Sequence, residues 1–337
     1  MHAVLSLFAT IMIATSIGTV GANALLLVLF ASHLKLRTDT WALTLNLSIC
    51  DLIFGMCVVP IAIYNSLFQG GIFAEGGIAC QLLGFLFVLL QLASLNSLVW
   101  ATIDKFAEIG FPLRYAQLIT KKRIMFILAI LWIYAIVVAA LPFMGFGVYS
   151  FNKDVYMCLP AFGPSTTAYS VLFLTVGVLV PITGISILYL SIIHIARYQA
   201  KRGTFVCNDQ HCYYVPIRSY FRNTLVLIVS AFYLLVCWLP SVIISFYETF
   251  YTSNVPVIAK MVSIWLVVLT STLNPWINSL AQRNYRRALR EGWRKLKRIF
   301  ESLGSSSERQ NDNNERHLNT QSQQCLPGHN TQTLTQT

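Results

Sequence analysis

The sequence predicts an all-α membrane protein, a seven-transmembrane helix bundle with an amphipathic cytoplasmic eighth helix. The composition is the first reason: 56% of the 337 residues are hydrophobic, 11% are charged and the mean hydropathy is +0.63. Soluble domains carry roughly 25% charged residues, so this chain has the composition of a membrane protein. The other two reasons are seven long apolar stretches and a strongly asymmetric distribution of Lys and Arg.

Each apolar stretch is longer than the roughly 20 residues that a helix needs to cross a bilayer. They cover approximately residues 4–31, 41–67, 77–103, 124–147, 166–197, 219–247 and 255–281. The first stretch has no basic leader and is too long for a signal-peptide core, so we expect it to be a membrane-spanning helix. The predicted organisation is a short extracellular N-terminus (1–3), the bundle (4–281), a surface helix (282–300) and a disordered cytoplasmic tail (301–337).

The basic residues predict the orientation. Of 24 Lys and Arg, only Lys153 and Lys260 fall outside the loops and the tail expected on one side. By the positive-inside rule this side is the cytoplasm, which predicts an extracellular N-terminus and a multi-pass protein of the plasma membrane. The net charge of +11 does not indicate nucleic-acid binding, because the cations are spread over several short loops.

The segment after the seventh stretch combines apolar side chains at three- and four-residue spacing with many cations. Its apolar residues are Tyr285, Leu289, Trp293, Leu296 and Phe300. This pattern is typical of a helix that lies on a membrane surface, and its cations predict anionic lipids as partners.

An ordered set of motifs, at least one in most of the helices, follows this organisation. The motifs are Gly21-Ala22-Asn23, Asn46-Leu47-Ser48-Ile49-Cys50-Asp51, Trp132, Pro181, Tyr189, Cys237-Trp238-Leu239-Pro240 and Asn274-Pro275. With these motifs, about residues 15–300 resemble the rhodopsin-like (class A) G-protein-coupled receptors. The resemblance implies a receptor that binds a small extracellular ligand and signals through a heterotrimeric G protein. An enzyme is disfavoured because the spans contain no paired carboxylates or nucleophile–base arrangement, and a transporter because we see no internal repeats.

Two cysteines, Cys80 and Cys158, are the ones expected on the extracellular side. The resemblance and the oxidising compartment favour a disulfide between the start of the third helix and the second extracellular loop, the alternative being two free thiols. The loop cysteines Cys207 and Cys212 resemble half of a zinc site, but a solvated loop is the better interpretation because zinc needs four ligands.

Asp51 lies in the middle of a span, where a carboxylate is costly and indicates function. The resemblance implies a sodium pocket formed by Asp51, Ser94, Ser271 and Asn274 beneath Trp238, and hard oxygen ligands suit such a cation. The alternative is a protonated Asp51 within a buried polar cluster. A sodium ion is therefore the one candidate cofactor.

Several positions that act as switches in the family differ here. The usual Asp-Arg-Tyr is Asp104-Lys105-Phe106, which follows the third span, and Lys lacks the planar fork of Arg. Asn278 replaces the tyrosine that would meet Tyr189 on activation, and Leu234 replaces a phenylalanine. The resemblance also assigns switch roles to Trp238, Pro240, Asn274 and Pro275. The altered positions predict weak G-protein coupling, and the alternative function is a non-signalling or decoy receptor.

The resemblance also carries negative information about the ligand. Phe87 stands where monoamine receptors have an aspartate, which disfavours a classical amine ligand. Val268 stands where opsins have the retinal-binding lysine, which excludes a photopigment. The expected pocket wall consists of Phe87, Gln91, Trp238, Phe246, Tyr247, Glu248 and Trp265. Such an aromatic wall fits a small organic or lipid-like ligand, with Glu248 meeting a cation at the mouth. The alternative is that these aromatic side chains only pack the bundle.

Overall fold

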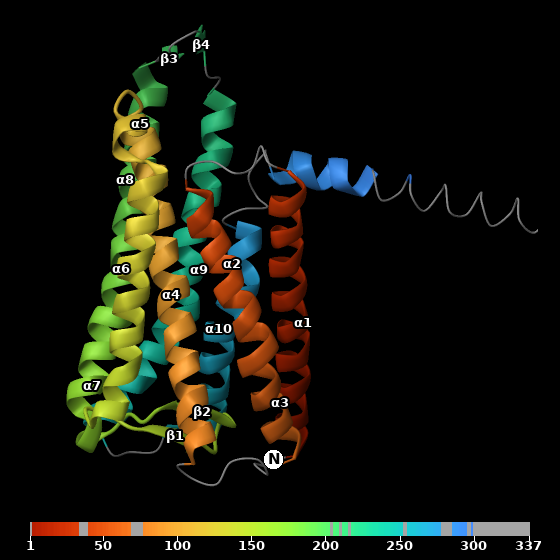
Figure 1. Cartoon of the computed structure of the whole chain (residues 1–337), viewed down its shortest axis with the longest axis vertical. Coiled ribbons are helices and arrows are strands. Elements are labelled where there is room, and N and C mark those ends of the chain that lie inside the picture. The colour runs from red at the N-terminus through yellow and green to blue at the C-terminus, as the bar shows by residue number, and fades with distance from the viewer. Residues whose placement is uncertain are drawn as a thin grey trace, which may run out of the picture. The chain divides into compact units, whose positions relative to one another are not determined.

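The computed structural model describes residues 2–33, 40–68, 77–202, 205–208, 211–214, 217–251, 255–277, 285–294 and 298. Within this part of the chain, seven helical segments are long and apolar enough to cross a membrane. They stand side by side as a bundle (Figure 1). The chain divides into two compact units, residues 1–285 and 286–337. The first unit contains the seven crossings and both sites described below.

The elements follow the predicted order. The first three crossings are α1 (His2–Ser32), the run α2 (Trp41–Ile53), η2 (Phe54–Val58) and α3 (Val59–Leu67), and α4 (Ile78–Gly110), followed by the short α5 (Tyr115–Leu118). The fourth crossing is α6 (Lys121–Ala140) with η3 (Leu141–Met144). The fifth is the run η4 (Pro164–Thr166), α7 (Thr167–Leu172), η5 (Phe173–Leu179) and α8 (Val180–Arg202). The sixth is α9 (Ile217–Phe250) and the seventh is α10 (Val257–Pro275). The hairpins are β1 (Tyr149–Asn152) with β2 (Met157–Pro160) and β3 (Phe205–Asn208) with β4 (His211–Tyr214).

The third crossing is longer than predicted. The expected span ended at residue 103, with a break at Asp104, whereas α4 continues to Gly110. The end of the helix was predicted too early because the charged residues Asp104 and Lys105 were taken to mark it. Ala107 and Glu108, which follow, are good helix formers. The helix stops where Phe111 leaves the helical conformation, with φ −132°, one residue before Pro112. A proline disfavours the helical conformation in the residue before it.

Two crossings contain a segment of π-helix that the sequence analysis did not predict. These segments, η2 and η5, end two residues before Pro60 and Pro181. A proline ring in a helix collides with the carbonyl group four residues earlier and donates no backbone hydrogen bond. Those carbonyl groups belong to Met56 and Gly177, which lie inside the wide turns. The wide turns therefore let both helices continue past their prolines.

The antiparallel hairpin β1–β2 covers one end of the bundle, and β3–β4 lies at the opposite end (Figure 1). A disulfide joins Cys158 of β2 to Cys80 of α4 with Cα atoms 5.4 Å apart, which confirms the predicted bridge. A Cβ atom on Gly84 would lie 2.5 Å from the ring of Tyr149 in β1, so glycine lets the hairpin pack directly on α4. Burial raises the pKa of the Tyr149 phenol far above its usual value, and the neutral hydroxyl donates to the Ala139 carbonyl over 2.8 Å.

The predicted eighth helix is present over residues 285–294. Its first residue, Tyr285, packs edge to face on Phe30 of α1, with ring centroids 5.8 Å apart. Burial raises the pKa of Tyr285 to about 12, so the phenol stays neutral and hydrogen-bonds with Thr44. Residues 282–284, 295–297 and 299–300 of the predicted helix, and the predicted tail, lie outside the described residues.

Candidate functional site

A buried carboxylate joins three helices in the middle of the bundle. Asp51 of α2 is 1% exposed. Its Oδ1 accepts hydrogen bonds from the hydroxyls of Ser94 on α4 and Ser271 on α10, each over 2.9 Å, and its Oδ2 accepts one from the amide of Asn274 over 2.9 Å. The structure thus brings together all four residues of the predicted sodium pocket. These three donors satisfy a carboxylate that would otherwise be very costly to bury.

A fourth helix joins this cluster through a residue that the sequence analysis missed. The Tyr233 hydroxyl on α9 donates to Oδ1 of Asn274 over 2.5 Å. Tyr233 is 7% exposed, and it lies five residues before Trp238 on the same helix. The signal in the sequence was a tyrosine within a strongly apolar stretch, because a buried phenol normally requires a partner.

The oxygen atoms around Asp51 suit a small hard cation. The group offers one carboxylate and two hydroxyls, whereas Asn274 turns its amide nitrogen toward Asp51 and its oxygen toward Tyr233. Oxygen ligands of this kind favour a hard cation over a transition metal. No group of three or more His, Cys, Asp or Glu side chains gathers anywhere in the described part of the chain. The hydroxyls of Ser94 and Ser271 can rotate and present lone pairs instead of protons. Because Asp51 supplies a single negative charge, these oxygen atoms fit a monovalent ion better than a multivalent one.

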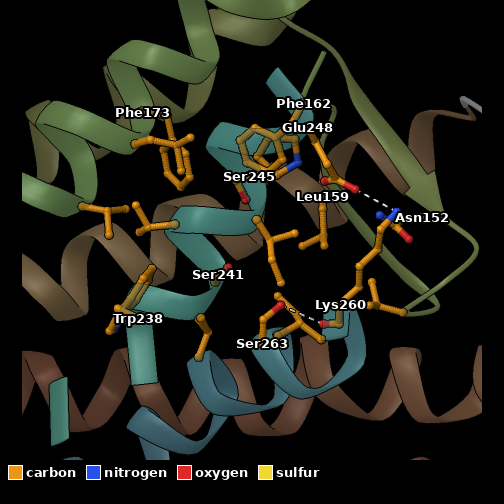
Figure 2. A pocket seen from close by; sticks show the side chains of 18 of the residues that line it. Asn152, Leu159, Phe162, Phe173, Trp238, Ser241, Ser245, Glu248, Lys260 and Ser263 are labelled. Carbon is orange, nitrogen blue, oxygen red and sulfur yellow. Dashed lines mark hydrogen bonds and ion pairs between the residues drawn. The ribbon is translucent and has the colours of Figure 1, made fainter. Parts of the chain in front are cut away.

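A cavity opens between this cluster and the β1–β2 hairpin, with Trp238 in its wall (Figure 2). The volume of this cavity is about 70 Å³. Of the predicted wall residues, Phe87, Trp238 and Glu248 line it. The remaining lining residues are Asn152, Val155, Leu159, Pro160, Phe162, Phe173, Leu174, Val178, Ser241, Val242, Ile244, Ser245, Lys260, Ser263, Ile264 and Val267.

Two predicted wall residues, Gln91 on α4 and Trp265 on α10, are not part of this lining. Gln91 is 3% exposed and lies one turn of α4 beyond Phe87, within the core. Trp265 points toward α1, where its indole N–H donates to the Thr15 hydroxyl over 3.0 Å. Neither residue lines this cavity, and their contact with a ligand stays a prediction.

Phe246 and Tyr247 on α9 are also absent from the lining. Phe246 stacks on Phe250 with ring centroids 6.4 Å apart, and Tyr247 stacks on Tyr251 and is 41% exposed. Consecutive helical residues point about 100° apart, because a turn has 3.6 residues. The face of α9 that meets the cavity carries Ser241, Ser245 and Glu248. Phe246 and Tyr247 point away from it.

The chain supplies a cation of its own at the mouth of the cavity, next to Glu248. Nζ of Lys260 on α10 lies 2.7 Å from Oε1 of Glu248 and 2.7 Å from Oδ2 of Asp154 in the hairpin turn. Lys260 is one of the two cations expected outside the cytoplasmic loops and tail. Its pairing could not be predicted from the sequence because the partners lie 106 and 12 residues away.

At the other end of the bundle, Asp104 accepts hydrogen bonds from the hydroxyls of Thr40, over 3.0 Å, and Tyr115, over 2.7 Å. Glu108, one turn further along α4, interacts electrostatically with both Asp104 and Lys105.

The remaining switch positions fall on several helices. Phe106 packs edge to face on Phe111, with ring centroids 5.9 Å apart. Tyr189 on α8 is fully buried, and its hydroxyl has no hydrogen-bond partner among the described residues. Pro240 lies within α9 and Pro275 ends α10. Asn278, the expected replacement for a tyrosine, lies outside the described residues.

Comparison with known proteins agrees with this architecture. The sequence model of the family "7 transmembrane receptor (rhodopsin family)" matches residues 22–277. The chain is 26% identical to "Rhodopsin, GQ-coupled" of Mizuhopecten yessoensis, over 82% of this chain and 57% of that protein. It is 25% identical to Melanopsin-B of Gadus morhua (86% and 48%) and 27% identical to Melatonin receptor type 1C of Gallus gallus (83% and 79%).

The chain thus spans about half the length of the first two relatives. The family match nevertheless covers three quarters of this chain and extends from the first crossing to the end of the seventh. It agrees with the seven crossings of the structure. The chain therefore belongs to the rhodopsin family of seven-transmembrane receptors.

Proposed function

We propose that this protein is a plasma-membrane receptor that binds a small ligand in the cavity beneath the β1–β2 hairpin and signals through a heterotrimeric G protein. The observation that carries the proposal is the position of α9. This helix contributes Trp238 to the cavity wall and Tyr233 to the polar cluster around Asp51. A ligand that moves Trp238 therefore acts on the same helix that is hydrogen-bonded to α10.

The orientation of the proposed receptor follows from the disulfide and the charges. The Cys80–Cys158 bridge supports an extracellular position for the end of the bundle that carries β1–β2, because disulfides persist in oxidising compartments. The Lys and Arg residues of the loops support a cytoplasmic position for the opposite end. The ligand would then enter from outside and the G protein would bind from inside.

A sodium ion is the proposed allosteric ligand of the Asp51 cluster. Asp51 would supply the charge, and Ser94, Ser271 and Asn274 would supply neutral oxygen atoms. An ion in this place would supply positive charge that stabilises the ionised carboxylate. Tyr233 would then share Asn274 with the ion, and this competition would couple the occupancy of the cluster to the position of α9.

A G-protein dissociation assay across subtypes, in cells with and without the receptor, tests the proposed signalling. We expect at least one subtype to show higher basal dissociation when the receptor is present. At equal surface expression, Lys105→Ala should lower this signal, because it removes a cation from the G-protein end. Lys153→Ala, which removes an exposed cation from the hairpin, should leave it unchanged.

The weak coupling expected from Lys105 and Asn278 gives this assay a second informative outcome. If no subtype responds to the receptor at normal surface levels, signalling is excluded and the chain functions as a non-signalling ligand-binding receptor. A response that is equal in wild type and Lys105→Ala would preserve the receptor function and remove Lys105 from the coupling surface.

A further inference from the structure

Three charged side chains from three different segments meet at the mouth of the cavity. Lys260 on α10 contacts Asp154 of the hairpin turn and Glu248 near the end of α9, each over 2.7 Å. The side chains of Lys260, Glu248 and Asp154 are 17%, 21% and 34% exposed, respectively. The cluster is therefore partly shielded from solvent, and its electrostatic interactions are stronger than those of fully exposed ions.

The three charges are not equivalent as seen from the cavity. Glu248 and Lys260 line it, whereas Asp154 does not. Asp154 thus balances the ammonium group of Lys260 from outside, and one negative charge remains on the cluster. Lys153 is next to Asp154 in sequence, but it is exposed and lies outside the lining. Of the two carboxylates that share Lys260, Glu248 is the one that a ligand in the cavity meets.

The cavity below Glu248 provides aromatic surfaces and hydroxyl groups. The rings of Phe162 and Phe173 are stacked with centroids 6.5 Å apart, and Trp238 lies deeper in the wall. Ser241 and Ser245 line the same side of α9, and Figure 2 shows them on the helix that leads from Trp238 toward Glu248. This arrangement has one charged end and one aromatic end.

We propose that Glu248 binds the protonated amine of an arylalkylamine ligand whose ring occupies the aromatic part of the cavity. The inference rests on the proposed function and adds the chemical class of the ligand. Because Phe87 replaces the aspartate of monoamine receptors, the amine would be bound from α9 instead of α4. An ammonium group would pair with Glu248 in a partly desolvated setting and would gain from the neighbouring aromatic faces. An anionic group would meet Lys260 already paired with two carboxylates, so the net charge of the cluster would repel it.

Three probes with similar aromatic bodies and different charge test this proposal on the purified full-length protein. They are phenethylamine, which is cationic, 2-phenylethanol, which is neutral, and 3-phenylpropanoate, which is anionic. The measurement is the probe concentration that gives half of the maximal thermal stabilisation. We expect phenethylamine to act at a concentration about tenfold lower than 2-phenylethanol, as expected for one added charge-assisted hydrogen bond. We expect 3-phenylpropanoate to be the weakest of the three.

Variants of the cluster separate the charge effect from loss of structure. Glu248→Gln should abolish the preference for the amine over the alcohol. Asp154→Asn, which changes a residue outside the cavity, should reduce this preference because Lys260 would then neutralise Glu248. Lys260→Met, or Lys260→Gln if the first variant does not fold, should increase the preference. Lys153→Met is the matched control, and it should leave the preference unchanged.

Equal potency of the amine and the alcohol, a preference for the anion, or no stabilisation by the amine would each overturn the proposal. These results would not bear on the proposed signalling, which is measured separately by G-protein dissociation. Conversely, an amine preference that depends on Glu248 would support the ligand class even if no G protein were activated.

Discussion

The hydroxyl of Tyr233 on α9 donates a hydrogen bond of 2.5 Å to the side-chain oxygen of Asn274 on α10. Through the Asn274 amide, which donates to Asp51, this bond extends the central polar cluster to a fourth helix. It joins the helix that carries Trp238 to the helix that ends at Pro275. Any rearrangement that separates α9 from α10 must break it.

Tyr233→Phe should therefore loosen the contact between α9 and α10. The variant leaves the buried oxygen of Asn274 without this donor, which costs about 1–3 kcal/mol. We expect a lower melting temperature for the purified protein and higher basal G-protein dissociation at equal surface expression. Tyr64→Phe, which removes the hydroxyl of a 43% exposed tyrosine on α3, is the control. Unchanged stability and signalling in Tyr233→Phe would mean that this bond does not restrain α9.

Loss of the disulfide should reduce the amount of receptor at the cell surface. Cys80 and Cys158 lie 78 residues apart in the chain, and a native bridge of this kind contributes about 2–5 kcal/mol. We expect Cys80→Ser, Cys158→Ser and the double variant to show similarly low surface levels by antibody labelling of intact cells. Cys57→Ser, at an exposed free cysteine, should stay at the wild-type level. Wild-type levels in the bridge variants would contradict this prediction.

Sodium should stabilise the purified receptor through Asp51. Replacing potassium chloride with sodium chloride at constant ionic strength should raise the melting temperature, with a stabilisation on the order of 1 kcal/mol at several times Kd. Asp51→Asn should remove this difference because it removes the only carboxylate among the proposed ligands. Persistence of the sodium effect in Asp51→Asn would exclude the pocket.

The substitution Lys105→Arg together with Asn278→Tyr should strengthen signalling. Arg restores a planar group that can stack against a G protein, and Tyr restores a phenol at the position expected to meet Tyr189. A gain of about 1.4 kcal/mol in the active state would raise the active population about tenfold while that state is a minority. The readout is basal and stimulated G-protein dissociation at equal surface expression. If the double variant signals no better than a strongly coupled wild type, these positions do not limit activation.

The basic segment after the seventh crossing should bind anionic membranes. A peptide of residues 282–300 should become helical on vesicles with anionic lipid and dissociate as salt is added. The expected contacts are Tyr285, Leu289, Trp293 and Phe300 with the hydrocarbon, and Arg286, Arg287, Arg290, Arg294 and Lys295 with the headgroups. Circular dichroism measures the helicity, and neutral vesicles are the control. Equal helicity on both kinds of vesicle would remove the electrostatic contribution.

The seven crossings and the disulfide could be predicted from the sequence. A crossing depends on a local pattern of residues, and the disulfide depends on the small number of cysteines expected on one side of the membrane. Hydropathy over about 20 residues identifies a crossing without any knowledge of its neighbours. Only two cysteines were expected on the extracellular side, so Cys80 and Cys158 had a single way to pair. The grouping of Asp51 with Ser94, Ser271 and Asn274 followed from the family resemblance.

The cavity wall could not be predicted in the same way, because it depends on the rotation of each helix. Phe246 and Glu248 are two residues apart and point about 200° apart on a helix, so an error of one or two positions reverses inside and outside. The contact between Lys260 and Asp154 depends on the fold of the hairpin, which no periodicity in the sequence indicated. Of the predicted aromatic wall residues outside the lining, Trp265 contacts α1, and Phe246 stacks on Phe250 of its own helix.

The two π-helical turns before Pro60 and Pro181 have a consequence for how receptors of this family are aligned. A π-turn accommodates one additional residue, which rotates everything on its far side by about 100° relative to an uninterrupted α-helix. A residue-by-residue alignment with a relative that lacks the turn is therefore correct on only one side of it. The residues before and after η2 or η5 should therefore be aligned separately, with the proline as the reference point for the residues on its side of the π-turn. Equivalent side chains then fall on the same face of the helix. A substitution chosen from such an alignment without this correction would alter a neighbouring face of the helix instead of the intended one.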